Sequence, residues 1–378
     1  MINNINMKYS NNFKQINWVD GMKINKDHFI GLENYFISRI RGWRGSMTDA
    51  FNYGLLPAEG GYEQTVNFIP DIDNQKLRVR LINCQAVTPS GYWIDISDDS
   101  QGKEGENTGS GVELSLDLSE LEEGDYYLVL SVDPFARVAV GQVSSTENPL
   151  RFPYVMPEYT LRMASVETGV KGKLDTDSII IGKFAYRNNR TEVISDYVPP
   201  CASIQSHPIL IKFYEYLIQE LQALEQNIIA LIAEINIRES SNILTETIHH
   251  LAGVLLMFLS ANATEYRWYL KNKPPVLMVD WAVTLAKIIK NELETRTAEE
   301  KEKLLNYFYD QFDINPSKFK QLLDNTINVE YDHDDINHAL EKSEEFLKVI
   351  STLFNELKKM EFIVGGKRKT KSIDIVIK

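Results

Sequence analysis

The chain has few of the residues that support covalent chemistry. Its two cysteines, Cys84 and Cys201, are too few for a disulfide framework and suit small hydrophobic positions with reduced thiols. His249 and His250 would point about 100° apart on a helix, and no third ligand stands at zinc-site spacing. The sequence also lacks a glycine-rich phosphate loop and a nucleophile motif. We therefore predict no enzyme activity, no catalytic residue, no metal and no other cofactor.

Positive charge and long apolar runs are also scarce. The net charge is −13, and the one dense basic run, 367–371, is more typical of a solvated turn than of a nucleic-acid patch. The most apolar run, 251–263, is shorter than the about 20 residues that span a bilayer. Residues 1–12 are polar and lack the apolar core of a signal peptide. These features predict a cytoplasmic protein that neither binds nucleic acid nor inserts into a membrane.

The first 200 residues alternate apolar and polar side chains and predict a β-rich domain. Several short strands separated by turn residues are typical of a sandwich. Pro134 should separate two strands of a hairpin, because proline cannot donate to a ladder. A helix is expected near 25–43, with Asp27 as a possible cap. The predicted strands are 77–82, 91–96, 126–132, 135–143, 159–166 and 178–186.

Between residues 201 and 314 the apolar spacing becomes helical. Seven apolar residues recur every three or four positions, as along the seam of a coiled coil or bundle. We therefore predict a helical bundle with helices at 213–235, 245–262, 276–293 and 298–308. The seam residues, which are our candidates for contacts between copies, are Phe213, Leu217, Leu221, Leu224, Ile228, Leu231 and Ile235.

The region 315–378 is predicted to form a small α/β domain. A helix at 317–325 is followed by the acidic stretch 330–335, which suits the solvated start of a long helix at 336–360; a cation site is the alternative. A β-hairpin is expected within 361–377. So small a unit should pack on the bundle or gain stability from a partner. The candidates for partner contact on the long helix are Phe346, Ile350 and Phe354.

Two short segments stand out as motifs although their spacing is not catalytic. The second of them, 196–208, contains Pro199 and Pro200, whose fixed φ angles predict a stiff hinge between domains. The first, 16–29, contains Trp18, Met22 and Phe29. Such side chains fit either the core of the first domain or an interface with a partner, where they often dominate binding. Its candidate docking residues are Trp18, Asp20, Gly21, Met22, His28 and Phe29.

These two segments resemble the TssK family of type VI secretion baseplate proteins. The first follows that family's pattern of apolar-x-Trp-x-acid-Gly-Met-x-apolar-x-Pro-x-His-Phe, except that Lys26 stands where the family usually has proline. The second matches through Val198-Pro199-Pro200, Ala202 and Ile204. The aromatic-Gly-Leu step at 53–55 and the apolar stretch 278–286 are also similar.

The resemblance implies an α+β protein with a β-sandwich shell at 1–200, a helical bundle neck at 201–314 and a small α/β head at 315–378. It further implies a homotrimer whose shell docks on the wedge proteins TssF and TssG through the first motif. The neck would hold the trimer together, and the head would contact the trans-envelope membrane complex. The head is about half as long as is usual for the family.

A different class of function also fits these features. A phage-like trimeric receptor-binding or tail-fibre protein could use the same β-sandwich to bind glycan. Copurification separates the two hypotheses, because an adaptor should retain TssF and TssG whereas a receptor-binding protein should bind a surface sugar.

Overall fold

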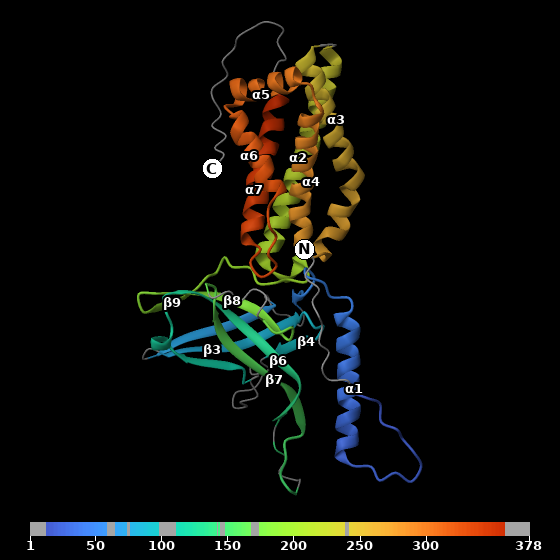
Figure 1. The fold of residues 1–378 in the computed structure, drawn as a ribbon, viewed down its shortest axis with the longest axis vertical. Coiled ribbons are helices and arrows are strands. Elements are labelled where there is room, and N and C mark those ends of the chain that lie inside the picture. Colours follow the sequence, from blue (N-terminus) through green and yellow to red (C-terminus); the bar gives the residue numbers. More distant parts are fainter. Residues whose placement is uncertain are drawn as a thin grey trace. The chain divides into compact units, whose positions relative to one another are not determined.

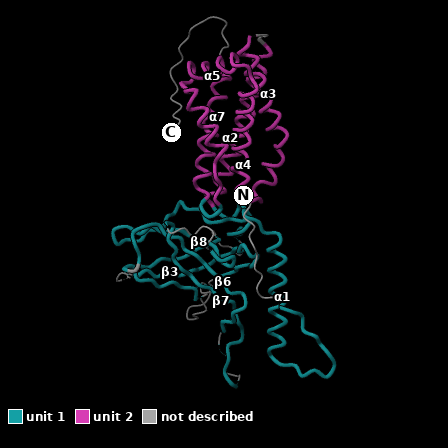
Figure 2. The backbone as a smooth tube through the Cα atoms, in the orientation of Figure 1, with its two compact units in different colours: residues 1–207, 333–335 teal, residues 208–332, 336–378 magenta. Residues whose placement is uncertain are grey.

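The structure, a computed structural model, describes residues 13–58, 65–73, 76–97, 111–141, 143, 148–167, 174–238 and 242–359. It divides into two compact units, of which unit 1 comprises 1–207 with 333–335 and unit 2 comprises 208–332 with 336–378 (Figure 2). Unit 1 contains the sheets, and the elements described in unit 2 are helices, so the predicted α+β class is confirmed. The two units meet along the chain at 207/208, slightly after the predicted boundary, and 314/315 lies inside unit 2.

Unit 1 contains two antiparallel sheets (Figure 1). In the first sheet, β3 pairs with β1, β2, β4 and β5, and the second has the order β7-β6-β8-β9. The sheets pack together where the Phe68 and Phe184 rings lie 5.7 Å apart, above Gly182. The strands are β1 (Gly54–Leu55), β2 (Val66–Asp73), β3 (Lys76–Val87), β4 (Trp93–Ser97), β5 (Glu113–Asp117), β6 (Gly124–Val140), β7 (Tyr154–Ser165), β8 (Ser178–Arg187) and β9 (Arg190–Val193).

Strand β6 is continuous where the sequence predicts two strands of a hairpin. The prediction that 135–143 pairs back on 126–132 is wrong, because β6 runs through Pro134 and pairs with β7 and β8 instead. The register of β6 against β7 shifts between Asp133 and Val138. Within this bulge the Asp133 carboxylate accepts hydrogen bonds from the backbone N–H groups of Phe135 and Ala136, at 3.0 and 3.3 Å. A bulge tolerates proline because the ladder needs no donor there.

The segments around Gly54 and Pro200 meet although they are far apart in sequence. The Leu55 N–H donates to the Pro200 carbonyl at 2.7 Å, and the Ala202 N–H donates to the Leu55 carbonyl at 2.9 Å. Pro199 and Pro200 are both buried in unit 1. The structure thus places the proline pair in a hydrogen-bonded strand-like segment within unit 1, before the boundary at 207/208, and not at a free hinge.

Three residues of the acidic stretch at 330–335 belong to unit 1. His333 is buried, and its Nε2 lies 3.0 Å from the Tyr53 carbonyl oxygen. The Tyr53 hydroxyl donates to the Asp334 carboxylate at 2.9 Å. Lys183 lies 3.4 Å from the Asp335 carboxylate. These contacts correct the prediction of a solvated helix start, because aromatic and cationic partners surround the turn.

Unit 2 is a bundle of helices whose bounds lie within a few residues of those predicted. Helix α2 packs on α3 and α7, and α4 packs on α6 and α7. Short π and 3-10 turns, Glu265–Tyr269 and Leu270–Asn272, follow α3. The helices are α2 (Pro208–Arg238), α3 (Ile243–Thr264), α4 (Val276–Thr295), α5 (Ala298–Phe312), α6 (Pro316–Ile327) and α7 (Asn337–Leu357).

The region predicted as a separate head contributes to the core of unit 2. Helix α7 buries ten of its residues, and Phe346, Ile350 and Phe354 are among them. Of the two alternatives raised by its small size, packing on the bundle is the one found for α6 and α7. The predicted hairpin at 361–377 lies outside the described residues.

Helix α3 and the turns after it are more apolar than the count of uninterrupted residues suggests. Among the described residues, Ile243–Asn272 is long and apolar enough to cross a membrane by length and composition alone. The prediction that no stretch is long enough is therefore corrected on that criterion. That prediction was based on the longest unbroken apolar run. The mean hydropathy of a helix can be high even when Thr, His and Ser interrupt the run, as they do here. Seven residues of α3, including Leu251 and Leu255, are buried in unit 2.

Substitution of Gly54 tests how much unit 1 depends on its contact with Pro200. Gly54 has φ +100°, and a Cβ there would lie 2.1 Å from the Pro200 carbonyl oxygen. We expect Gly54→Ala to lower the free energy of unfolding by more than the roughly 1–2 kcal/mol of left-handed strain, because the β1 backbone must also shift. Chemical denaturation monitored by the fluorescence of unit 1 tryptophans measures this.

Gly21→Ala is the matched control for that experiment. Gly21 also has a positive φ, +78°, but a Cβ there would meet nothing within 4 Å. Only the strain should remain, so the loss should be clearly smaller. Equal losses for the two variants would show that the approach to Pro200 is unimportant.

Candidate docking surface

The motif at 16–29 forms a turn and the capped start of helix α1 (Lys26–Gly45). The Asn25 side chain accepts hydrogen bonds from the N–H groups of Asp27 and His28, at 3.1 and 3.2 Å. In return His28 Nδ1 accepts from the Asn25 N–H at 3.1 Å. The cap of the helix is therefore Asn25 and not Asp27, the residue predicted from the sequence. Lys26 is the first helical residue, where proline is favoured but not required, so this departure from the family pattern leaves the cap intact.

A tight turn before the helix brings Trp18 close to His28. The Met22 N–H donates to the Val19 carbonyl at 3.2 Å, and Gly21 takes the positive φ that this turn requires. The Trp18 and His28 rings lie 6.0 Å apart. His28 therefore both completes the cap and positions the indole, which is a structural reason for its place in the motif.

The large apolar side chains of this region face away from the core. Gly45 is the only buried residue of α1. The exposed fractions are 46% for Trp18, 55% for Phe29, 53% for Phe36, 65% for Ile40 and 67% for Trp43. Core packing, one of the two hypotheses for Trp18 and Phe29, is therefore wrong. Asp20 and Gly21 are also exposed, whereas Met22 and His28 are partly buried.

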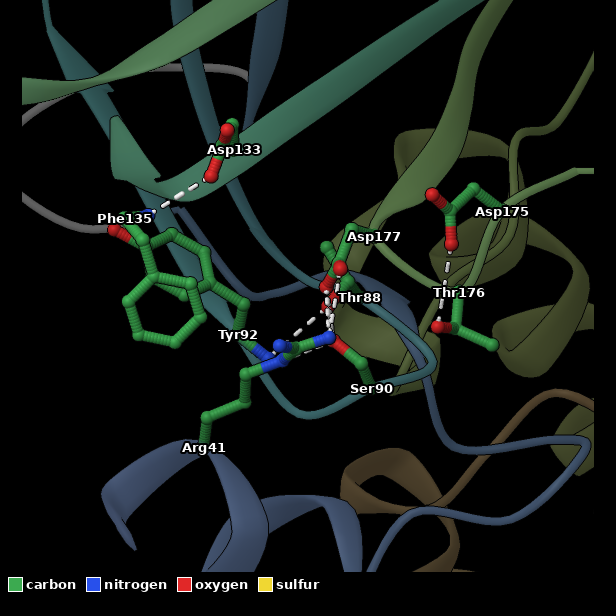
Figure 3. A network of polar contacts seen from close by, with 9 residues as sticks. All are labelled: Arg41, Thr88, Ser90, Tyr92, Asp133, Phe135, Asp175, Thr176 and Asp177. Carbon is green, nitrogen blue, oxygen red and sulfur yellow. Dashed lines mark hydrogen bonds and ion pairs between the residues drawn. The ribbon is translucent and has the colours of Figure 1, made fainter. Parts of the chain in front are cut away.

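A polar network holds the C-terminal half of α1 on the sheets (Figure 3). Arg41 Nη2 lies 2.6 Å from both carboxylate oxygens of Asp177, and its Nε donates to Ser90 Oγ at 3.0 Å. Ser90 Oγ in turn donates to Asp177 at 2.5 Å. Burial raises the pKa of Asp177, while Ser90 and Arg41 favour its ionised form. Because Nη2 and Nε of one planar guanidinium bind two different partners, the contact fixes orientation as well as distance, and Arg41 sets the direction of α1.

Gly91 allows the close approach of α1 that this network needs. A Cβ on Gly91 would lie 2.2 Å from the backbone nitrogen of Gly45 and 2.6 Å from the Arg41 carbonyl oxygen. Gly91 also has a positive φ, +88°. Helix α1 and the turn before β4 are therefore in backbone contact at this point.

A second pair of contacts links α1 and the segment before the motif to the bulge of β6. Arg137 donates to the Glu33 carboxylate at 2.6 Å, and both side chains are partly exposed. The Phe13 and Phe135 rings lie 4.6 Å apart. Figure 1 shows that α1 and the end of the β6–β7 pair both extend away from the sheets of unit 1.

The end of the β6–β7 pair is a second exposed apolar region, which the sequence reasoning did not identify. Beyond the bulge only two strands remain paired, Val138–Val140 with Tyr154–Met156. A two-stranded ribbon is marginally stable by itself in water. The signal in the sequence is the segment 150–155, in which four of six residues are large and apolar or aromatic although no strand was predicted there. The exposed side chains are Val138, Leu150, Phe152, Tyr154 and Val155.

The other predicted site residues lie inside unit 2. All seven residues of the α2 seam, from Phe213 to Ile235, are buried within a single chain. The same holds for Phe346, Ile350 and Phe354 on α7. Core packing therefore explains the spacing of both groups, and contacts of these residues with other chains stay predictions.

No group of three or more His, Cys, Asp or Glu residues that could hold a metal ion occurs in the part of the chain that the structure describes. Both cysteines are buried, and burial raises the pKa of the Cys84 thiol to about 12. His333, in the acidic stretch, lies with its Nε2 3.0 Å from the Tyr53 carbonyl oxygen.

Some solved structures with a similar fold are TssK proteins. No family model matches the chain, and no curated protein matches it. A crystal structure of TssK is 15% identical, with a TM-score of 0.50, over 89% of this chain and 69% of the other. A chain in the baseplate complex from the type VI secretion system is 15% identical, with a TM-score of 0.50, over 93% of this chain and 71% of the other. The resemblance to TssK is thus confirmed at the level of the fold.

Substitution of Arg41 tests the anchor of α1. Arg41→Ala leaves the partly buried Asp177 carboxylate without its cation, so we expect a loss of about 1–3 kcal/mol in the free energy of unfolding. Backbone amides of α1 should exchange hydrogen faster, while those of β6 and β8 stay protected. Hydrogen exchange with mass spectrometry measures both.

Arg137→Ala is the matched control, because its ion pair with Glu33 is exposed. It should cost less than about 1 kcal/mol. If the α1 amides exchange hydrogen equally fast in the two arginine variants, the Arg41 network does not hold the helix.

Proposed function

We propose that this chain is a structural adaptor of the type VI secretion baseplate. It acts as a homotrimer in the cytoplasm, at the inner face of the cytoplasmic membrane, and connects the TssF/TssG wedge to the trans-envelope membrane complex. The observation that carries the proposal is the exposed apolar surface of the motif and α1 on a unit with the fold of TssK. A TssK chain in a baseplate subcomplex with TssF and TssG gives an example of such an assembly. The adaptor role requires no catalytic residue.

The wedge-docking site is proposed to be the motif end of α1. Trp18, Asp20, Gly21 and Phe29 are exposed there, Met22 and His28 are partly buried, and the His28 ring lies 6.0 Å from that of Trp18. Exposed aromatic side chains on a rigid, capped element are suited to be hot spots, because little conformational entropy is lost on binding. The capping box and the Gly21 turn supply that rigidity.

Trimer formation is proposed to use exposed residues of unit 2. The seam from Phe213 to Ile235 is already satisfied within one chain. Helices α2 and α3 still expose Ile229, Ile237 and Met257. An apolar residue exposed on a helix can serve a neighbouring copy without repacking of the core.

The membrane-complex contact is proposed for the region from Asn315 onwards. Phe346, Ile350 and Phe354 support α7 from inside, so exposed residues of the region must provide the contact itself. Removal of 316–378 would delete α6 and α7 and with them part of the unit 2 core. A deletion therefore cannot test the contact without disturbing the fold.

Trp18→Ala tests the docking role. Because the indole is nearly half exposed, its removal should change the melting temperature by less than about 3 °C while it weakens TssF/TssG binding at least tenfold. Interferometry with the purified TssF–TssG complex and thermal denaturation of the same variant provide both quantities. Unchanged affinity in the folded variant would contradict docking through the motif.

Leu224→Asp and Ile229→Asp, on the same helix, separate core from interface. Leu224 is 2% exposed, so its carboxylate should cost more than about 3 kcal/mol and reduce the helical circular dichroism signal. Ile229 is 50% exposed, so its variant should stay folded. If α2 contributes to the trimer, that variant should lose the trimer by light scattering. A wild-type protein that scatters as a 43.4 kDa monomer would refute the trimer.

A further inference from the structure

We infer that the exposed stripe of α1 binds an acidic amphipathic helix of a partner protein. This inference rests on the proposed docking function and specifies what lies along the helix. The stripe consists of Phe29, Phe36, Ile40 and Trp43, all more than half exposed. It begins next to the motif turn but continues well beyond it.

The spacing of the stripe fits a helical partner. Its members are separated by seven, four and three residues. At about 100° per residue, they fall within a sector of about 60° and extend over about 21 Å. An uninterrupted apolar stripe with heptad-like spacing is the complement of another helix with the same spacing. An extended strand would instead require an exposed row of backbone groups, and a helix such as α1 has none.

The opposite side of α1 is already occupied. Arg41 and Gly45, which contact Asp177 and Gly91, lie roughly opposite the stripe on the same helix. On an adjacent side, a Cβ on Gly31 would lie 3.2 Å from Ile16, and Gln15 donates to the Tyr35 hydroxyl at 2.9 Å. The stripe residues, each more than half exposed, are therefore large apolar side chains that α1 presents to solvent in the described part of the chain.

Charge selects an acidic partner over another copy of this chain. Arg39 and Arg44 flank the stripe on its two sides, about 60–80° from Phe36. Among the described residues, neither guanidinium lies within 4.0 Å of a carboxylate, and Arg39 lies 5.3 Å above the Tyr35 ring. Copies that packed stripe to stripe would bring these arginines together, whereas Asp or Glu residues beside an apolar seam would pair with them. Glu33, on the same surface, is neutralised by Arg137.

Affinity measurements test the charge and the apolar contact separately. The probe is the purified TssF–TssG complex, titrated at 50 and 300 mM NaCl. We expect Ile40→Asp to weaken binding at least tenfold at both salt concentrations. Arg39→Glu combined with Arg44→Glu should weaken it at least tenfold at low salt and reduce the dependence on salt. The matched control, Arg162→Glu with Arg190→Glu, makes the same charge change on exposed strand positions and should leave affinity within twofold.

A photo-crosslink identifies the occupant. With benzoylphenylalanine in place of Ile40, mass spectrometry should find crosslinks to a wedge segment with apolar residues every three or four positions and Asp or Glu beside them. Crosslinks to a second copy of this chain, or to a segment without that spacing, would overturn the inference.

The failure of this inference differs from failure of the proposed function. If Trp18→Ala weakens wedge binding but the Ile40 and arginine variants do not, the wedge docks at the motif and the stripe is not involved. If no variant matters because the wild type does not bind the wedge, the proposed function itself fails.

Discussion

The ion pair between Arg41 and Asp177 decides where the proposed docking surface of this protein lies. Helix α1 buries one residue, Gly45, so the hydrophobic effect does little to hold it in place. The Arg41 guanidinium supplies the missing constraint, since its Nη2 binds Asp177 while its Nε binds Ser90, and two separate partners fix a direction. The pair is partly shielded from solvent and therefore less screened by salt than a surface pair. The arrangement leaves the whole apolar stripe of the helix available to another molecule.

A strand-like contact has a similar role deeper in unit 1. Gly54 approaches Pro200 so closely that a side chain at position 54 would overlap the backbone. The aromatic-Gly-Leu step and the Pro-Pro step, which the sequence presents as separate motifs, are therefore two sides of one contact. Tyr53, next to this glycine, also contacts the turn at 333–335 through its ring, its carbonyl oxygen and its hydroxyl. The two motifs thus secure the end of the β-rich segment and the turn together.

The sequence predicted the elements well and their surroundings poorly. Every predicted helix has a counterpart, because the spacing of apolar residues follows directly from helix geometry. The same spacing cannot distinguish a neighbouring helix of the same chain from one of another chain, so Leu224 and Phe354 were assigned to interfaces although they lie in a core. Asn25 and Asp27 both belong to residue types that cap helices well. The reciprocal hydrogen bond from the Asn25 N–H to His28 Nδ1 decides between them. The continuity of β6 depends on a bulge stabilised by the Asp133 side chain, which proline rules do not reveal.

The distribution of exposed apolar residues in unit 1 supports the proposal that this unit binds a partner. The sheets bury their inward residues, such as Leu77, Leu81 and Leu128, without remainder. Large exposed apolar side chains lie on α1 and at the end of the β6–β7 pair, and a few others, including Ile69, Ile72 and Trp93, lie on the sheets. Monomeric proteins rarely keep large continuous apolar regions in water, because each such side chain forgoes about 1–3 kcal/mol of burial. Since these side chains contribute little burial to the fold of the single chain, their burial by another protein would contribute its free energy to binding.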